Sequence, residues 1–173
     1  TIGGGTILDL HPPERHRRTA ARRADLSAMA DANPITAISG ILAGEKGFLD
    51  LDAFARDRAA SDSLPAVVMR RMDLVVLPAG ESLVAMLPSV WQRYTTDAAG
   101  VLERYHEEKP DLPGLGQERL RLALKPRLPA HVFAPALARL VADGVVVLDR
   151  SWVRRPGHEV RFSEEEERIW AGI

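Results

Sequence analysis

The sequence contains no cysteine among its 173 residues, which excludes disulfide bonds and thiolate metal sites and suits a reducing compartment. It has no apolar run approaching the roughly 18 residues needed to span a bilayer, and no charged-then-apolar leader that would support secretion. A formal net charge of −1 gives the chain no overall attraction to nucleic acid or to an anionic membrane, so any such binding must depend on local patches. We therefore expect a cytoplasmic protein without membrane contacts.

The composition, with 46% hydrophobic and 27% charged residues, is that of an ordinary globular protein. The length suffices for one large domain or two small ones. The chain begins at Thr1 with an isolated extended segment, which could not bury itself alone. We expect the sequence to be a piece of a longer protein.

The start TIGGGTILDL places three glycines, Gly3 to Gly5, between apolar residues. A glycine-rich loop can bind phosphate, but this spacing matches neither G-x-x-x-x-G-K-[ST] nor G-x-G-x-x-G followed by a helix. The segment continues as an extended stretch to His11-Pro12-Pro13. Residues 1–14 are therefore interpreted as a glycine bend within or beside a β-strand, followed by an exit.

An arginine- and alanine-rich stretch without glycine or proline follows and predicts a linker helix within residues 15–32, from about Arg15 to Asp31. Arg15, Arg18 and Arg22 have the spacing of one helix face. That face suits either an RNA contact or solvent. Acidic residues further along dilute the charge, which favours the solvated linker.

Residues 33–90 predict a first winged helix. A helix begins at Pro34 and ends near Gly44, the short strand GFLDL follows, and a second helix is capped by Asp50 or Asp52. A third helix has Ser63 at its cap. Two apolar strands joined by Pro78-Ala79-Gly80-Glu81 complete the unit.

The same order repeats over residues 91–162 and predicts a second winged helix. A long amphipathic helix ends at Lys109-Pro110, a short helix follows, and a third helix runs to Gly144 with Pro135 near its start or at a kink. The wing is two strands around a three-residue turn, Asp149 to Ser151. The expected apolar positions are Val90, Tyr94, Ala98, Val101, Leu102, Tyr105, Leu115, Leu120, Leu122, Leu124, Val132, Phe133, Leu137, Leu140 and Val141.

Residues 163–173 start another helix, with Ser163 and Glu166 at capping-box spacing, and are interpreted as the start of a truncated third winged helix. The predicted fold class is α+β, mainly helical, with tandem winged-helix domains of three helices and a β-hairpin.

Several segments resemble the bacterial selenocysteine-specific elongation factor family. TIGGGTILDLHPPERHR is similar to the closing segment of its translation-factor β-barrel, so residues 1–14 would be the end of a barrel strand. LERYHEEKPDLPGLGQERLRLAL, VFAPALARLVADG and VRRPGHEVRFSEEEERIW resemble the second winged helix of its carboxy-terminal extension and the entry to the third. The most specific matches are Gly3 to Gly5, His106 with Pro110, Pro113-Gly114-Leu115 and Pro156-Gly157-His158. The first winged helix corresponds mainly by position.

The resemblance implies a GTP-dependent translation factor that carries selenocysteinyl-tRNA to the ribosome and recognises a hairpin in the messenger RNA. GTP and Mg²⁺ are implied for the amino-terminal domains of the whole protein, and no cofactor for this segment. The hairpin is read chiefly by the last winged helices. The segment would therefore connect the two working ends.

The residues themselves indicate no catalytic chemistry. The five histidines lie in separate segments without an H-x-x-x-H pair, and no serine has the glycines of a nucleophile elbow. A metal site formed by the glutamates of the final segment is not expected, because consecutive helical residues point in different directions. We do not expect the segment to be an enzyme, and nothing suggests an oligomer.

The candidates for RNA contact are basic residues of the second unit. In an ordinary winged helix the third helix reads bases, but here that helix offers only Arg139, so phosphate contacts with little sequence discrimination are expected. Tandem winged helices also form DNA-binding transcription regulators and pure protein-interaction scaffolds, which remain the alternatives. The candidate residues are Arg119, Arg121, Lys125, Arg127, Arg150, Arg154, Arg155, His158 and Arg161.

Overall fold

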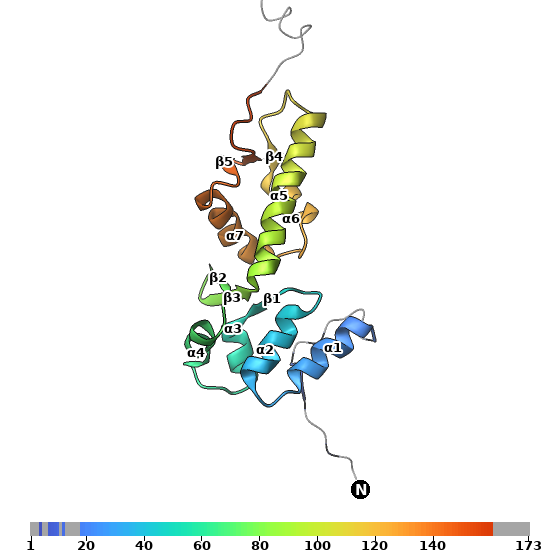
Figure 1. The fold of residues 1–173 in the computed structure, drawn as a ribbon, viewed down its shortest axis with the longest axis vertical. Coiled ribbons are helices and arrows are strands. Elements are labelled where there is room, and N and C mark those ends of the chain that lie inside the picture. The colour runs from blue at the N-terminus through green and yellow to red at the C-terminus, as the bar shows by residue number, and fades with distance from the viewer. Residues whose placement is uncertain (1–3, 5–6, 11, 13–17, 161–173) are drawn as a thin grey trace, which may run out of the picture. The chain divides into compact units, whose positions relative to one another are not determined.

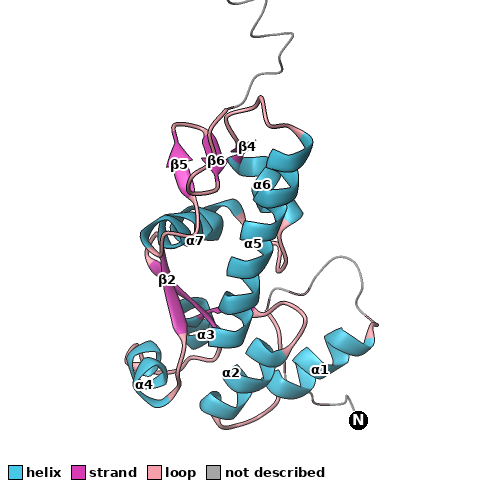
Figure 2. Cartoon of the chain, turned by 45° about the horizontal axis from the view of Figure 1, so that its top comes forward, coloured by secondary structure: helices cyan, strands magenta, loops and turns pink. Residues whose placement is uncertain are grey.

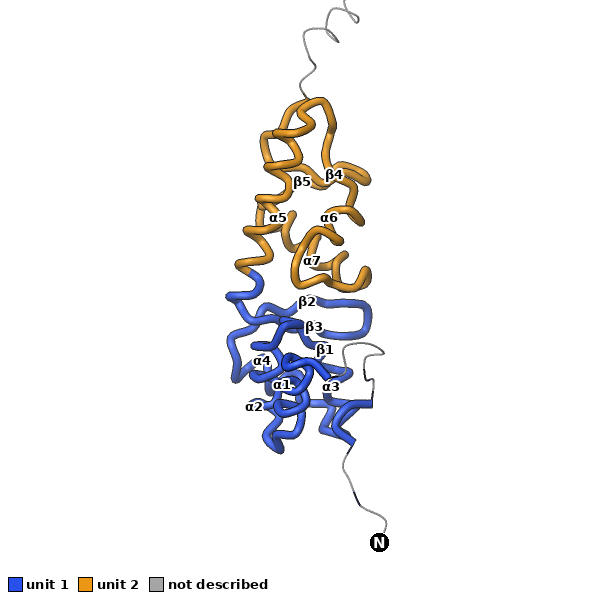
Figure 3. Tube along the Cα trace, turned by 90° about the vertical axis from the view of Figure 1, so that its right-hand side faces the viewer, with its two compact units in different colours: residues 1–91 blue, residues 92–173 orange. Residues whose placement is uncertain are grey.

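The structure of the protein, a computed structural model, describes residues 4, 7–10, 12 and 18–160 (Figure 1). Gly3, Gly5, Arg15, Arg161 and the expected start of a third unit at 163–173 lie outside the described residues. The chain divides into two compact units, residues 1–91 and 92–173 (Figure 3). Among the described helices none is long and apolar enough to cross a membrane.

The linker helix, α1 (Ala20–Met29), begins later than the sequence predicted. Thr19 is its N-cap, and its hydroxyl accepts a hydrogen bond from the Arg22 amide at 3.1 Å. Arg22 forms an ion pair with Asp9, so it is not part of an open basic face. The helix lies against α2 (Pro34–Ala43), where Gly40 leaves room for Ala28.

The first unit has the expected winged-helix order (Figure 2). After α2 come β1 (Phe48–Asp50), α3 (Leu51–Asp57), α4 (Leu64–Arg71), β2 (Val75–Ala79) and β3 (Ser82–Met86). The three strands form an antiparallel sheet in the order β1-β3-β2. The helices bury Ile38, Leu42, Leu51 and Val68 in a core completed by Ala85 of the central strand.

Local hydrogen bonds decide the alternatives that the sequence left open in this unit. Asp50 is the cap of α3 and accepts from the Ala53 amide at 2.8 Å. Asp52 instead accepts from the Leu83 amide at 2.7 Å, which ties α3 to the hairpin. Ser63 stands at the N-cap position of α4 without a side-chain cap bond.

The hairpin turn of the first unit is shorter than predicted. Ala79 pairs with Ser82, so the turn contains only Gly80 and Glu81, and Pro78 lies within β2. The glycine has φ +67°, a conformation that other residues rarely adopt. A proline is tolerated in β2 because this strand is at the edge of the sheet.

The second unit repeats the arrangement. Its elements are α5 (Pro88–Glu108), most of which belongs to this unit, β4 (Leu115–Gly116), α6 (Gln117–Ala123), α7 (Ala130–Ala142), β5 (Val147–Asp149) and β6 (Trp152–Arg154). The strands form an antiparallel sheet in the order β4-β6-β5. The core gathers Tyr94, Leu102, Leu120, Leu140 and Val153 from the helices and the central strand.

The structure corrects two details of this unit and decides the position of Pro135. Asp149 pairs with Trp152, so the wing turn has two residues rather than three, and Arg150 adopts φ +54° there. Leu122 and Val141, expected in the core, are 45% and 37% exposed. Pro135 lies inside α7, beyond its first turn, where it removes one helical hydrogen bond. The predicted class, α+β and mainly helical with winged-helix units, is confirmed.

Candidate nucleic-acid interface

The two arginines of α6 differ: Arg121 is held by hydrogen bonds within the described part of the chain, whereas Arg119 is not. Arg121 donates two hydrogen bonds to the Glu118 carboxylate and one, at 2.8 Å, to the Leu128 carbonyl. Its side chain is only 16% exposed. The Glu118 carboxylate has a pKa below its usual value, chiefly because of the hydrogen bond from Arg121. Arg121 therefore closes the loop between α6 and α7.

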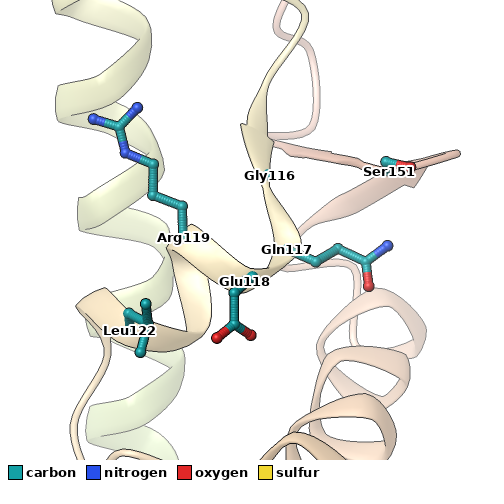
Figure 4. A pocket seen from close by; sticks show the side chains of 6 residues that line it. All are labelled: Gly116, Gln117, Glu118, Arg119, Leu122 and Ser151. Carbon is teal, nitrogen blue, oxygen red and sulfur yellow. The ribbon is translucent and has the colours of Figure 1, made fainter.

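Arg119, two residues earlier, is exposed and lies with its guanidinium 5.7 Å from the centre of the Tyr105 ring. This distance fits a cation–π contact, which orients the guanidinium without neutralising it. Figure 4 shows Arg119 extending toward α5, away from Gln117 and Ser151. The Arg119 side chain thus presents an oriented positive charge with donors available to a phosphate.

The loop after α6 supplies Lys125 and Arg127, both exposed. Arg127 donates to the Leu122 carbonyl at 3.3 Å through one guanidinium nitrogen, which leaves other donors available. Lys125 lines a groove beside α5. Lys125, Arg127 and Arg119 are therefore cations of α6 and the loop after it. None of them forms an ion pair with a carboxylate among the described residues.

The wing residues that the sequence analysis proposed for RNA contact differ in their partners within the chain. Arg150 is exposed in the turn. Arg154 donates to the His158 carbonyl at 3.1 Å, and Arg155 forms an ion pair with Glu103 of α5. Arg154 and Arg155 therefore stabilise the position of the segment after β6. Arg150 is the exposed wing arginine that forms no ion pair with a described residue.

His158 and His106 also connect the segment after β6 to the end of α5. Their rings stack with centroids 3.5 Å apart. The His158 Nε2–H donates to the Leu112 carbonyl at 2.9 Å, and His106 Nε2 accepts from the Arg155 amide at 3.3 Å. Burial, with the nearby charges of the His158 and arginine side chains, lowers the pKa of His106 to about 4. Both histidines thus hold the segment after β6, residues 155–158, against the end of α5.

A hollow of about 620 Å³ lies between α6 and the wing turn, lined by Gly116, Gln117, Glu118, Arg119, Leu122 and Ser151 (Figure 4). Its carboxylate already bonds Arg121, and Gln117 donates to the Arg150 carbonyl at 3.3 Å. Across the described part of the chain, no group of three or more histidine and carboxylate side chains is placed to hold a metal ion.

The sequence interpretation missed Arg104, which lines the groove together with Lys125. The available signal was Gly100, a glycine in the middle of a long helix one turn before Arg104. The groove therefore brings Arg104 and Lys125 together, while Arg119 lies over Tyr105 and Arg127 contacts the Leu122 carbonyl. Arg161 lies outside the described residues.

The fold is that of a tandem winged-helix protein, because each unit contains three helices and a three-stranded antiparallel sheet in winged-helix order, and the first unit has α1 in addition. Residues 100–154 match the family model described as "Elongation factor SelB, winged helix". The chain is 30% identical over 172 residues to the selenocysteine-specific elongation factor of Escherichia coli (strain K12), covering 98% of this chain and 27% of that protein. It is 24% identical over 185 residues to the selenocysteine-specific elongation factor of Haemophilus influenzae, covering 99% of this chain and 27% of that protein.

Residues 100–154 thus form a winged helix of the selenocysteine-specific elongation factor family, and the resemblance drawn from the sequence is confirmed. The chain spans about a quarter of the length of the curated relatives it matches. This similarity supports a role in translation.

Proposed function

We propose that the chain is the connecting segment of a GTP-dependent translation factor for selenocysteine incorporation. It joins the domains that bind GTP, Mg²⁺ and selenocysteinyl-tRNA to the part that binds the messenger hairpin, and it works as a monomer in the cytoplasm beside the ribosome. The observation that carries the proposal is similarity along 98% of this chain to about a quarter of a selenocysteine-specific elongation factor.

The charges on the third helix of each unit support a connecting role over sequence reading. In α7 the only arginine is Arg139, which forms an ion pair with Asp143 at 2.9 Å. In α4 the basic residues Arg70 and Arg71 stand at the end of the helix. A helix that reads base edges needs side chains with free donors in the major groove. This distribution disfavours the DNA-binding regulator.

We further propose that the segment contacts RNA phosphates without reading sequence. Arg119, Lys125, Arg127 and Arg150 are exposed, and none forms an ion pair with another described residue. Guanidinium and ammonium groups bind phosphate oxygens, and such binding weakens as salt rises. A pure protein scaffold would not need these exposed cations.

The connecting role is tested by a chimera of the Escherichia coli relative in which the corresponding segment is replaced by this chain. Selenocysteine insertion is measured with a reporter whose UGA codon is followed by the messenger hairpin. The matched control replaces the same segment by a flexible glycine- and serine-rich linker of equal length. We expect the chimera with this chain to insert selenocysteine above the level of the linker control.

Equal insertion by both chimeras would mean that the segment acts only as a tether. No insertion by the chimera with this chain, at a protein level matched by immunoblot, would contradict the connecting role. A scrambled messenger hairpin should abolish insertion in every case. The part proposed to read the hairpin is the same in both chimeras, and the exchanged segment is not proposed to read it.

A further inference from the structure

A groove of about 330 Å³ runs along α5 beside the end of α6. We call its α5 side, which is lined by Thr96, Asp97, Gly100, Val101 and Arg104, the floor of the groove. Ala123 and Lys125 form the wall that comes from α6 and the loop after it. The groove lies within the second unit, in the region matched by the family model except at its amino-terminal end.

No residue that the structure describes packs against Gly100 closely enough to require a glycine there. A Cβ built on it would meet no heavy atom within 4 Å, and its position inside a regular helix does not need the freedom of glycine. Glycine in a helix interior destabilises the helix relative to alanine. Because no described neighbour requires it, a glycine at the floor of a groove suits the close approach of a ligand.

The groove carries two cations without partners. Arg104 and Lys125 line it, and neither makes an ion pair or a hydrogen bond to any residue in the described part of the chain. Asp97 is the only carboxylate in the lining, so the formal charge of the groove is +1, from two cations and one anion. The charge of the whole chain is −1, so this surface differs in sign from the average.

Arg119 extends the positive surface along α5. Its guanidinium lies over Tyr105, the residue next to Arg104, and Arg127 follows Lys125 by two residues on the α6 side. Glu107 and Glu108 lie one turn further along α5 and mark the end of this surface. Cations along an open groove fit a chain of phosphates better than a single small anion.

From this geometry we infer that the groove at Gly100 binds the sugar–phosphate backbone of an RNA strand, with Arg104 and Lys125 as phosphate ligands. The inference rests on the proposed phosphate contacts and gives them a site. The strand lies against the floor at Gly100, where a side chain would keep it at a distance. Arg119 and Arg127 contact the neighbouring phosphates, and no base is read.

The test is a fluorescence-anisotropy titration of the full chain against a labelled unstructured oligouridylate and a labelled transfer RNA, each at two salt concentrations. Gly100→Ala should raise the melting temperature by about 3 °C and weaken the affinity for both RNAs. Gly100→Gln, which fills the groove, should weaken the affinity about fivefold or more. A substitution that stabilises the fold while it weakens binding is not explained by damage to the structure.

Arg104→Ala should weaken binding and lower the slope of log affinity against log salt by about 1. Two changes on α7 serve as controls. Ala138→Gln adds the same side chain to an exposed helical position away from the groove, and Arg139→Ala removes a cation that is already paired with Asp143. Neither control should change the affinity by more than about twofold.

The outcomes separate the groove from the proposed function. If the wild-type chain binds RNA but Gly100→Gln binds as tightly as Ala138→Gln, the groove is not the site, while phosphate contacts elsewhere survive. If the wild-type chain binds neither RNA, both the groove and the proposed phosphate contacts are wrong, and the groove would be a surface for another class of partner. The connecting role is judged separately by the chimera.

Discussion

His106 and His158 lie ring on ring, with centroids 3.5 Å apart and planes inclined by 15°. One ring belongs to the last turns of α5 and the other to the segment after the wing. His106 Nε2 accepts a hydrogen bond, so its proton in the neutral form is on Nδ1, whereas His158 Nε2 carries its proton to the Leu112 carbonyl. The stacked rings and their two hydrogen bonds thus join the segment after β6 to the end of α5.

This pair predicts a loss of stability in weak acid. The pKa of His106 is lowered to about 4 in the folded chain, against about 6.5 for an ordinary histidine. The unfolded chain therefore binds one more proton between these values, so the free energy of unfolding falls as the pH drops from about 6.5 to about 4. The full shift would correspond to about 3 kcal/mol, and we expect a loss of about 1 kcal/mol, because solvent near the ring reduces both the effect of burial and the effect of the neighbouring charges.

The measurement is urea unfolding at several pH values across this window. His106→Gln should be less stable at pH 7.5 but should flatten the pH dependence, because the titrating group is gone. His131→Gln is the control, since His131 is exposed on α7. An unchanged pH dependence in His106→Gln would contradict the account of the pair.

The backbone around Gly114, in the same unit, leaves no room for a side chain. A Cβ at this position would lie 2.6 Å from the Val153 carbonyl oxygen, and both atoms belong to positions that the backbone fixes. We expect Gly114→Ala to destabilise the second unit by about 2 kcal/mol. Gly116→Ser is the control, because a Cβ there meets nothing within 4 Å and serine is a favourable N-cap for α6. Thermal unfolding followed by circular dichroism distinguishes the two, and equal melting temperatures would refute the clash.

The hydrogen bond from the Leu83 amide to Asp52 predicts that loss of this carboxylate will speed hydrogen exchange at Leu83. Its carboxylate accepts from the Leu83 amide at 2.7 Å, across 31 residues of sequence. Asp52→Ala should remove about 1.5 kcal/mol of stability, the ordinary contribution of a hydrogen bond to a charged group. Hydrogen exchange measured by NMR should show faster exchange at Leu83 than in the wild type. Asp62→Ala, at an exposed position before α4, should leave that amide unchanged; if both variants behave alike, the bond does not protect it.

The order of elements could be predicted from the sequence because glycine, proline and apolar spacing are local signals. Pro34 and Gly44 bound α2 as expected, and Lys109-Pro110 follows the end of α5. The start of α1 was misplaced because Thr19, a good cap, was outweighed by the arginine-rich stretch before it. The turns were predicted too long because strand register depends on pairing between two segments.

The candidate site was harder to predict because charge alone does not reveal a partner. Arg154 and Arg155 are neighbours in sequence, yet Arg154 bonds the nearby His158 carbonyl and Arg155 pairs with Glu103 of α5, a helix far away in the sequence. The one local signal of the groove, Gly100 within a long helix, is informative only when the space around it is known. Tertiary structure therefore decides which cations are free to bind.

Arg119 and Arg121 give the sharpest comparison of a proposed RNA-binding residue with a structural one. They are two residues apart on α6, but Arg121 bonds Glu118 and the Leu128 carbonyl, whereas Arg119 rests over Tyr105. Arg121→Ala should lower the melting temperature, because the loop to α7 loses its hydrogen bonds. Arg119→Ala should leave the melting temperature nearly unchanged and weaken RNA binding with a smaller salt slope.

Both variants remove one positive charge, so each is the control for the other. The measurements are thermal unfolding and RNA anisotropy on the same preparations, with binding measured well below the melting temperature. Loss of RNA affinity by Arg121→Ala alone would place the contact at the loop between α6 and α7. Equal loss by both would mean that the net charge of α6, and not the oriented guanidinium beside the groove, governs binding.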